Sequence, residues 1–253
     1  MPDDAAPPRS RRAALGLLAA GLAVPALAAC SSGHDHARAA ASVPVGTPRP
    51  GTTIMIVRHA EKPDGSTHGV DADGSTDDEG LTPRGWSRAG ALGTLVAPLV
   101  GPVRSGLVRP TALFASDPGD HGSRRPGQTL TEVAAALRLP IDTTIRKADH
   151  AGIAAALVAA GGAPLVAWQH EDIPGIVAAL GAVTPTPPAA WPGDRFDVVW
   201  VLRAQGAGWS FAQVPQLLLA GDSPAPITGG ASGPDDRSAP RYGSGGSSGR
   251  SPS

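Results

Sequence analysis

The sequence is poor in several residue types on which common functions depend. Its 253 residues include one cysteine, Cys30, which excludes a disulfide within the chain and a catalytic thiol in the folded part. Aromatic residues amount to 4% and do not alternate with basic ones, so a nucleic-acid platform is not predicted. The formal net charge of −1 likewise gives no general attraction to nucleic acid or to an anionic membrane surface.

The beginning of the chain has the composition of a targeting segment. Arg9, Arg11 and Arg12 form a basic start, and an apolar run over residues 13–29 ends in small residues just before Cys30. A basic, an apolar and a small-residue region in this order are typical of a bacterial export signal. The run of 17 residues is also short for a helix that crosses a bilayer.

Two short motifs within this segment refine the prediction. The stretch "SRRAALGLL" at 10–18 resembles a twin-arginine export signal. The stretch "LAAC", Leu27–Cys30, resembles a lipobox, in which the cysteine is lipidated after cleavage. We therefore predict an export signal over residues 1–29. The mature protein would be exported and held by a lipid on Cys30 at the extracytoplasmic face of the cell membrane.

Composition divides the rest of the chain into three parts. Residues 30–50 are small, polar and interrupted by proline, as expected of a flexible tether. Residues 51–220 are about 170 in number, enough for one domain with a well-filled core. Residues 221–253 are dominated by Gly, Ser and Pro, which bury too little surface to offset ordering, and are predicted to be a disordered tail.

Strand and helix signals alternate within the central part. Short, continuous apolar runs predict buried strands at 53–57, 112–115, 164–168 and 198–202. Ala-rich segments predict helices at 83–96, 125–137, 148–160 and 173–180. Thr82 before Pro83 matches the N-cap and first position of a helix. This alternation predicts an α/β fold, a single three-layer α/β/α domain with a mostly parallel sheet.

Polar side chains follow three of the predicted strands directly. Arg58 and His59 come after the first, Arg125 opens the helix after the second, and His170 and Glu171 follow the third. Ligands of open α/β sheets bind outside the carboxyl ends of the strands, so we expect these residues to converge. Guanidinium groups match phosphate oxygens two at a time, and a neutral imidazole is a nucleophile. The set therefore suits phosphoryl chemistry.

The same segments resemble the histidine phosphatase superfamily, with its phosphoglycerate-mutase-like fold. The resemblance lies in "RHAE" at 58–61, "LTPRG" at 81–85, "RPGQT" at 125–129 and His170, in that order. It covers roughly residues 52–220, nearly the whole predicted domain.

The resemblance implies a phosphomonoester phosphatase that works through a covalent phosphohistidine. His59 would be the nucleophile, and Arg58, Arg125 and His170 would bind the phosphoryl oxygens. His59 has to be neutral when it attacks, with a hydrogen bond at its other ring nitrogen fixing the tautomer. The implied substrate is a small phosphorylated compound or a phosphoprotein, with no metal and no cofactor. The insertions of true mutases are missing, which favours hydrolysis.

The proton donor to the leaving group stays open at this point. Glu171 is favoured because one branch of the family carries its acid directly after the second His. Asp172, Glu61 and Asp64 are the alternatives.

Gln169 stands where the family often has Gly or Ser, which changes the shape of the pocket. A non-catalytic envelope lipoprotein that binds an anion or a partner with the same pocket is the alternative function.

Residues 64–80 form an acidic loop next to the catalytic segment. Five Asp and one Glu lie in it, and we predict a solvated loop that disfavours highly anionic substrates. No metal site is predicted: His34, Asp35 and His36 in the tether lack the converging groups that orient metal ligands.

Overall fold

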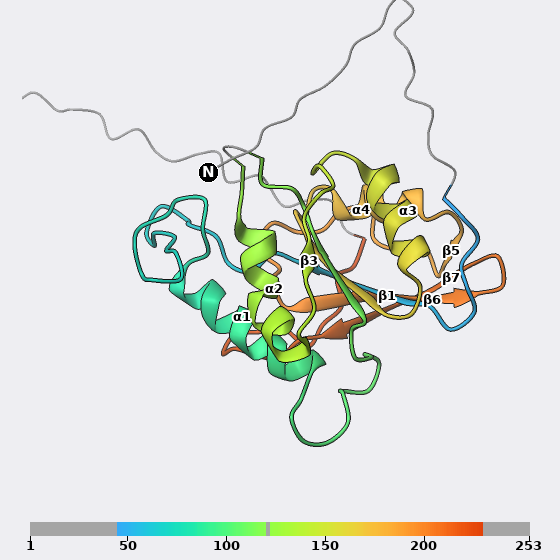
Figure 1. Cartoon of the computed structure of the whole chain (residues 1–253), viewed down its shortest axis with the longest axis horizontal. Helices are drawn as coiled ribbons and strands as arrows, with labels where there is room; N and C mark the ends of the chain where they lie inside the picture. Colours follow the sequence, from blue (N-terminus) through green and yellow to red (C-terminus); the bar gives the residue numbers. More distant parts are fainter. Residues whose placement is uncertain (1–44, 120–121, 230–253) are drawn as a thin grey trace, which may run out of the picture. The chain divides into compact units, whose positions relative to one another are not determined.

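The computed structural model describes residues 45–119 and 122–229. The predicted signal, Cys30, most of the tether and residues 230–253 lie outside this part of the chain. The described residues form the following elements (Figure 1): β1 (Thr53–Arg58), α1 (Pro83–Val96), β2 (Ala112–Ala115), α2 (Arg125–Leu137), β3 (Ile141–Asp142), α3 (His150–Ala160), β4 (Pro164–Trp168), α4 (Ile173–Ala179), β5 (Val183–Thr184), β6 (Val198–Gln205) and β7 (Gly208–Pro215). None of these helices is long and apolar enough to cross a membrane.

One sheet contains all the strands of the described chain, in the order β3-β2-β4-β1-β6-β7-β5. Neighbouring strands run parallel from β3 to β1 and between β7 and β5. β6 runs antiparallel to both β1 and β7. The predicted α/β class is confirmed, with a mixed sheet. β1, β2 and β4 are parallel neighbours, so their carboxyl ends lie at the same edge.

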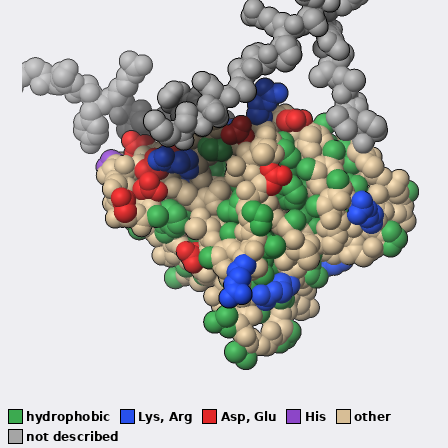
Figure 2. All heavy atoms as spheres, viewed as in Figure 1, with side chains coloured by type: hydrophobic (Ala, Val, Ile, Leu, Met, Phe, Trp, Pro, Cys, Tyr) green, Lys and Arg blue, Asp and Glu red, His purple; other side chains and the backbone are tan. Residues whose placement is uncertain are grey.

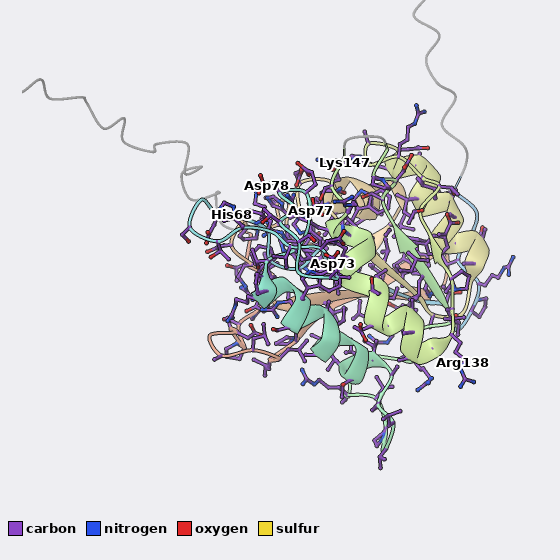
Figure 3. All side chains as sticks on the ribbon, turned by 60° about the vertical axis from the view of Figure 1, so that its left-hand side comes forward. His68, Asp73, Asp77, Asp78, Arg138 and Lys147 are labelled. Carbon is purple, nitrogen blue, oxygen red and sulfur yellow. The ribbon has the colours of Figure 1, made fainter. Side chains whose placement is uncertain are left out.

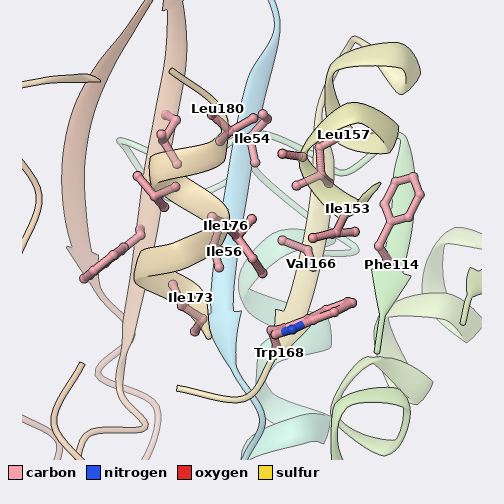
Figure 4. Close-up of a cluster of buried hydrophobic side chains, with 14 of the residues drawn as sticks. Ile54, Ile56, Phe114, Ile153, Leu157, Val166, Trp168, Ile173, Ile176 and Leu180 are labelled. Carbon is pink, nitrogen blue, oxygen red and sulfur yellow. The ribbon is translucent and has the colours of Figure 1, made fainter. Parts of the chain in front are cut away.

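The two faces of the sheet bury different helices. Ile54 and Ile56 of β1 pack with residues of α3 and α4, as Figure 4 shows. Met55 and Val57, on the opposite face, pack with residues of α1 and α2. Successive side chains of a strand point to opposite faces, so β1 is buried on both sides, and its residues form the continuous apolar run seen in the sequence.

Two neighbouring residues, Thr82 and Pro83, determine where the helix after β1 begins. The Oγ1 of Thr82 accepts a hydrogen bond from the backbone N–H of Gly85 at 3.1 Å, and Pro83 is the first residue of α1. Thr82 thereby satisfies one of the N–H groups that the first turn of a helix leaves without a partner. The start of α1 at residue 83 is confirmed.

The β6–β7 hairpin was missed in the sequence. β6 continues to Gln205 rather than stopping at residue 202, and β7 pairs with it across the two-residue turn Gly206–Ala207. Gly206 has a φ of 60°, the left-handed conformation that tight hairpin turns need. β7 is only partly buried, so it lacks the continuous apolar run that identified the other long strands. The two-residue strands β3 and β5 were also missed.

The folded part extends beyond the predicted boundary at residue 220. The side chain of Ile227 is 3% exposed and belongs to the core on the α3 and α4 side. Asp222 forms an ion pair with Arg88 of α1 at 2.7 Å. Residues 221–229 are therefore not part of a disordered tail. The Gly and Pro content of this segment predicted disorder, although Ile227 and Asp222 attach it to the domain.

Candidate active site

A cavity of about 320 Å³ opens at the carboxyl ends of β1, β2 and β4. Arg58 is the last residue of β1, and His59 follows it with its backbone N–H bonded to the carbonyl of Trp168 at the end of β4. The cavity is lined by His59, Lys62, Asp117, Gly122, Ser123, Arg125, Lys147, Gln169, His170 and Glu171. Four of the five predicted catalytic residues therefore share one cavity.

His59 is held in the tautomer that nucleophilic attack requires. It is 4% exposed, and its Nδ1 lies 2.7 Å from the carbonyl oxygen of Ala60. A carbonyl only accepts hydrogen bonds, so Nδ1 carries the proton and Nε2 carries the lone pair. Burial, followed by the positive charge of Arg58, lowers the pKa of His59 to about 3. The imidazole is consequently neutral across the physiological range.

Thr129 of α2 fixes the backbone that carries His59. Its Oγ1 accepts a hydrogen bond from the N–H of Ala60 at 2.8 Å and donates one to the carbonyl of Arg125 at 2.7 Å. Ala60 is thus bound on both sides, through its N–H to α2 and through its carbonyl to the ring of His59. The "RPGQT" segment contributes this threonine as well as Arg125, a role that the sequence did not reveal.

Arg58 is not among the residues that line the cavity. Its side chain is 1% exposed. Its Nη1 donates to the carbonyls of Pro192, Gly193 and Arg195, and its guanidinium carbon lies 3.8 Å from the ring centre of Phe196. Nε and Nη2 are buried without a partner in the described chain. Burial lowers the pKa of Arg58 to about 10, which leaves it charged at neutral pH.

The Nε and Nη2 of Arg58 are two buried donors without a partner in the described chain, and Arg58 does not line the cavity. A buried donor without a partner costs free energy, and two such donors on one guanidinium edge match two oxygens of a phosphate. Both atoms are closed to solvent in this structure, so a phosphoryl group could satisfy these donors only after Arg58 or the residues around it moved.

Arg125 lines the cavity and also ties the acidic loop to α2. Its Nε donates to the carbonyl of Gly80 at 3.0 Å, its Nη1 to Ser123 Oγ at 3.3 Å and its Nη2 to the carbonyl of Asp78. Its Nη2 also lies 3.6 Å from Glu79 Oε2, so of the five N–H donors of the guanidinium the second N–H of Nη1 has no partner among these contacts. In addition to its predicted role as a ligand of phosphoryl oxygens, Arg125 connects the acidic loop to α2 through these hydrogen bonds.

The acidic loop between β1 and α1 lies beside the cavity. Figure 2 shows Asp and Glu side chains gathered on the side of the molecule where this loop lies, and Figure 3 labels His68, Asp73, Asp77 and Asp78 on it. Asp77 forms an ion pair with Arg124, the residue before α2. The loop is therefore attached to the start of α2 at two neighbouring arginines.

Glu171 forms ion pairs that disfavour its predicted role as proton donor. Its Oε2 lies 2.8 Å from His170 Nδ1, and its Oε1 accepts from Lys147 Nζ. The hydrogen bond with His170, and then that with Lys147, hold the pKa of Glu171 well below its ordinary value. A carboxylate kept ionised in this way is suited to orienting His170 rather than to donating a proton.

The other three carboxyl candidates for the acid do not line the cavity. Asp172 accepts from His150 Nε2 at 2.8 Å. Glu61 accepts from Arg88 and Arg84 and lies in a separate cavity of about 240 Å³. Asp64 is exposed and caps the turn at Ser66.

Several cavity residues were not identified from the sequence. Lys62 lies three residues beyond His59, and Asp117 lies two residues beyond the end of β2. The position after a buried strand could have identified Asp117. Lys147 had no such signal, because it precedes α3 and reaches the cavity only through the packing of that segment. Gln169, noted as atypical, donates to Ser116 Oγ at 3.0 Å and so joins the ends of β4 and β2.

Within residues 45–119 and 122–229, no three His, Cys, Asp or Glu side chains are grouped so that they could hold a metal ion.

No protein-family model and no curated protein matches this chain. Among solved structures, it is similar to mycobacterial glucosyl-3-phosphoglycerate phosphatase bound to VO3, at 14% identity and a TM-score of 0.42, over 64% of this chain and 97% of that one. The native structure of that phosphatase has 15% identity and a TM-score of 0.37, over 63% and 96%. A mycobacterial hydrolase has 13% identity and a TM-score of 0.37, over 64% and 96%. At these identities and TM-scores the likeness carries no argument about the activity of this chain.

Proposed function

We propose that the protein is a phosphomonoester phosphatase of the histidine type, acting through a phosphohistidine at His59. The observation that carries the proposal is the buried, neutral His59, whose Nδ1 is bonded to Ala60 and whose Nε2 is left for attack. A nucleophile of this kind needs a cationic surrounding for the phosphoryl oxygens. Arg125 and His170 share its cavity, and Arg58 precedes it in the chain.

The reaction would take place in two steps. In the first, the Nε2 lone pair of His59 attacks phosphorus, the ester P–O bond breaks, and the leaving oxygen takes up a proton from an acid. In the second, water attacks the phosphohistidine, the P–N bond breaks, and the neutral imidazole is regenerated. The guanidinium of Arg125 and the imidazole of His170, both in the cavity lining, would hold the oxygens whose charge grows during transfer. Arg58 would join them only if its buried Nε–Nη2 edge opened to the cavity.

A binding protein that holds an anion without turnover is the second candidate. It is favoured by the ion pairs of Glu171, which leave the predicted proton donor ionised. In that protein, the cavity would bind phosphate through Arg125 and His170, but His59 would never be phosphorylated.

Hydrolysis of p-nitrophenyl phosphate between pH 4 and 8, with EDTA present, separates the two candidates. We expect turnover by the purified protein and a loss of about 10³-fold or more in His59→Ala, as for removal of other nucleophiles. His68→Ala is the matched control, because His68 lies on the exposed loop and outside the cavity. Activity that persists in His59→Ala would refute the proposal. Vanadate binding without turnover or labelling of His59 would establish the binding protein.

We also propose a location for the protein, and this part of the proposal rests on the sequence alone. The basic start, the apolar run and Cys30 favour an exported protein held at the membrane by lipid on that cysteine. Its substrate would then be a phosphorylated small molecule or a phosphoprotein outside the cytoplasm. Metabolic labelling with palmitate, which Cys30→Ser should abolish, checks the anchor.

A further inference from the structure

We propose that Asp117 is the proton donor to the leaving group, and the proton acceptor from water in the second step. This inference rests on the proposed phosphatase function and deepens it. Asp117 lies just beyond the end of β2, at the sheet edge where Arg58 ends β1 and His59 follows it, and Asp117 lines the same cavity as His59.

Elimination among the carboxyl groups is the first argument. Within the described chain, only Asp117 and Glu171 combine a carboxyl group with a place in the lining of the cavity. Glu171 lies between Lys147 and His170 and is held ionised. Asp117 forms no ion pair with any described residue, and its Oδ1 accepts only the N–H of Gly119 at 2.8 Å. Its other oxygen is therefore available to carry a proton.

The backbone around Asp117 is fixed from two directions. Its N–H donates to the carbonyl of Ile145 at 2.8 Å. The preceding Ser116 is buried and accepts from the amide of Gln169, the residue next to His170. The residue that departs from the family pattern, Gln169, thus joins the end of β2 to the segment that carries the second histidine. A carboxyl on this support keeps its place as the phosphoryl group moves.

The charges around Asp117 act in opposite directions. A bound phosphate monoester would bring negative charge into the cavity, which favours the neutral form of a carboxyl, whereas Lys62, Arg125 and Lys147 in the same lining favour the carboxylate. In the first step, the carboxyl proton moves to the leaving oxygen as the P–O bond breaks, which leaves a carboxylate. In the second, that carboxylate takes a proton from the attacking water as the P–N bond breaks. The carboxyl and the imidazole are both restored.

The test is the dependence of kcat/KM on the leaving group, since kcat/KM reports the first step alone. The three leaving groups differ in their need for a proton. p-Nitrophenol leaves readily without one, and glycerol leaves only when its oxygen is protonated. Phenol lies between them, with a pKa of about 10, like the tyrosine side chain. For Asp117→Asn we expect kcat/KM to fall by about 10²–10⁴-fold with glycerol 2-phosphate, the range of general acid catalysis. With p-nitrophenyl phosphate it should fall by no more than about 10-fold, and with phenyl phosphate by an intermediate factor.

The variant has a second readout that a structural defect would not produce. Asn keeps an oxygen that accepts from Gly119, so the turn is retained. Because the second step also needs Asp117, phosphohistidine should accumulate in Asp117→Asn with p-nitrophenyl phosphate, whereas a distorted pocket would label less. Asp142→Asn is the matched control. Asp142 accepts from the N–H of Thr144 two residues on, as Asp117 does from Gly119, but lies outside the cavity.

Each outcome decides the question. An equal loss with all three substrates would overturn the role of Asp117. A loss that grows with poorer leaving groups in Glu171→Gln, but not in Asp117→Asn, would assign the role to Glu171 instead. If the unmodified protein neither turns over any of the substrates nor labels His59, the proposed function fails, and the role of Asp117 fails with it.

Discussion

Replacing Thr129 by Val tests whether the link between α2 and Ala60 maintains the site. Valine has nearly the shape of threonine and removes only the hydroxyl, which is buried and makes two hydrogen bonds. The N–H of Ala60 would then be buried without a partner, at a cost of about 1–3 kcal/mol. The free energy of unfolding should fall by that amount.

The magnitude can be checked by two independent measurements. For a domain of this size, ~1–3 kcal/mol corresponds to a decrease of about 2–12 °C in Tm. Urea unfolding should show a lower midpoint with an unchanged m-value. Ala60 also accepts the Nδ1–H of His59, so phosphatase activity should fall further than the fraction of unfolded protein explains.

Thr129→Ser is the control, since serine keeps the hydroxyl and loses one methyl group. It should retain activity and most of the stability. The reasoning would be refuted if Thr129→Val unfolded within about 0.5 kcal/mol of the unmodified protein, the range of an ordinary surface substitution.

Three further predictions concern charge and burial. The pKa of Asp222 is lowered to about 2, with hydrogen bonds from Arg88 opposing the effect of burial, so its stabilising contribution is present above pH ~4 and disappears toward pH ~2. Arg88 keeps its ion pair with Glu61, so Asp222→Ala should lose about 1–3 kcal/mol at neutral pH, the range for hydrogen bonds to a charged group. Its free energy of unfolding in urea should also depend less on pH between ~4 and ~2. The imidazole of His59 should remain neutral in NMR spectra from pH 8 to about 4. In the unfolded chain, the imidazole of residue 59 takes up a proton near pH ~6.5. The free energy of unfolding should therefore fall as the pH decreases from ~6.5 toward about 3, and this decrease should be smaller in His59→Asn. Finally, Ile227→Ala should cost about 2–5 kcal/mol, whereas Leu99→Ala, at a side chain that is 100% exposed, should cost less than ~0.5 kcal/mol.

The sequence predicted the strands in which nearly every residue is buried. β1, β2 and β4 are short apolar runs because helices cover both faces of their part of the sheet. α1 begins where Thr82-Pro83 predicts, and α2 has the bounds predicted from its Ala-rich segment. β7 and the segment 221–229 depend on contacts made far away in the sequence, such as the pair Asp222–Arg88, and no local pattern indicates them.

The candidate site was predictable as a set of residues but not as a network of contacts. The rule that polar groups follow buried strands brought His59, Arg125 and His170 together correctly, and Asp117 obeys the same rule. The partners of each charge could not be read from the sequence. The pairing of Glu171 with Lys147 depends on the path of the segment before α3, and that of Glu61 with Arg88 depends on the packing of α1.

The hydrogen bonds of Arg58 have a consequence for the newly made protein. The carbonyl of Gly193, which binds the Nη1 of Arg58, lies 135 residues further along the chain. A ribosome that has synthesised residues 53–59 has made both Arg58 and His59, yet the guanidinium has no carbonyl to orient it until the segment before β6 has been synthesised. A product that ended before residue 192 would therefore contain His59 beside an arginine that none of these three carbonyls holds in place.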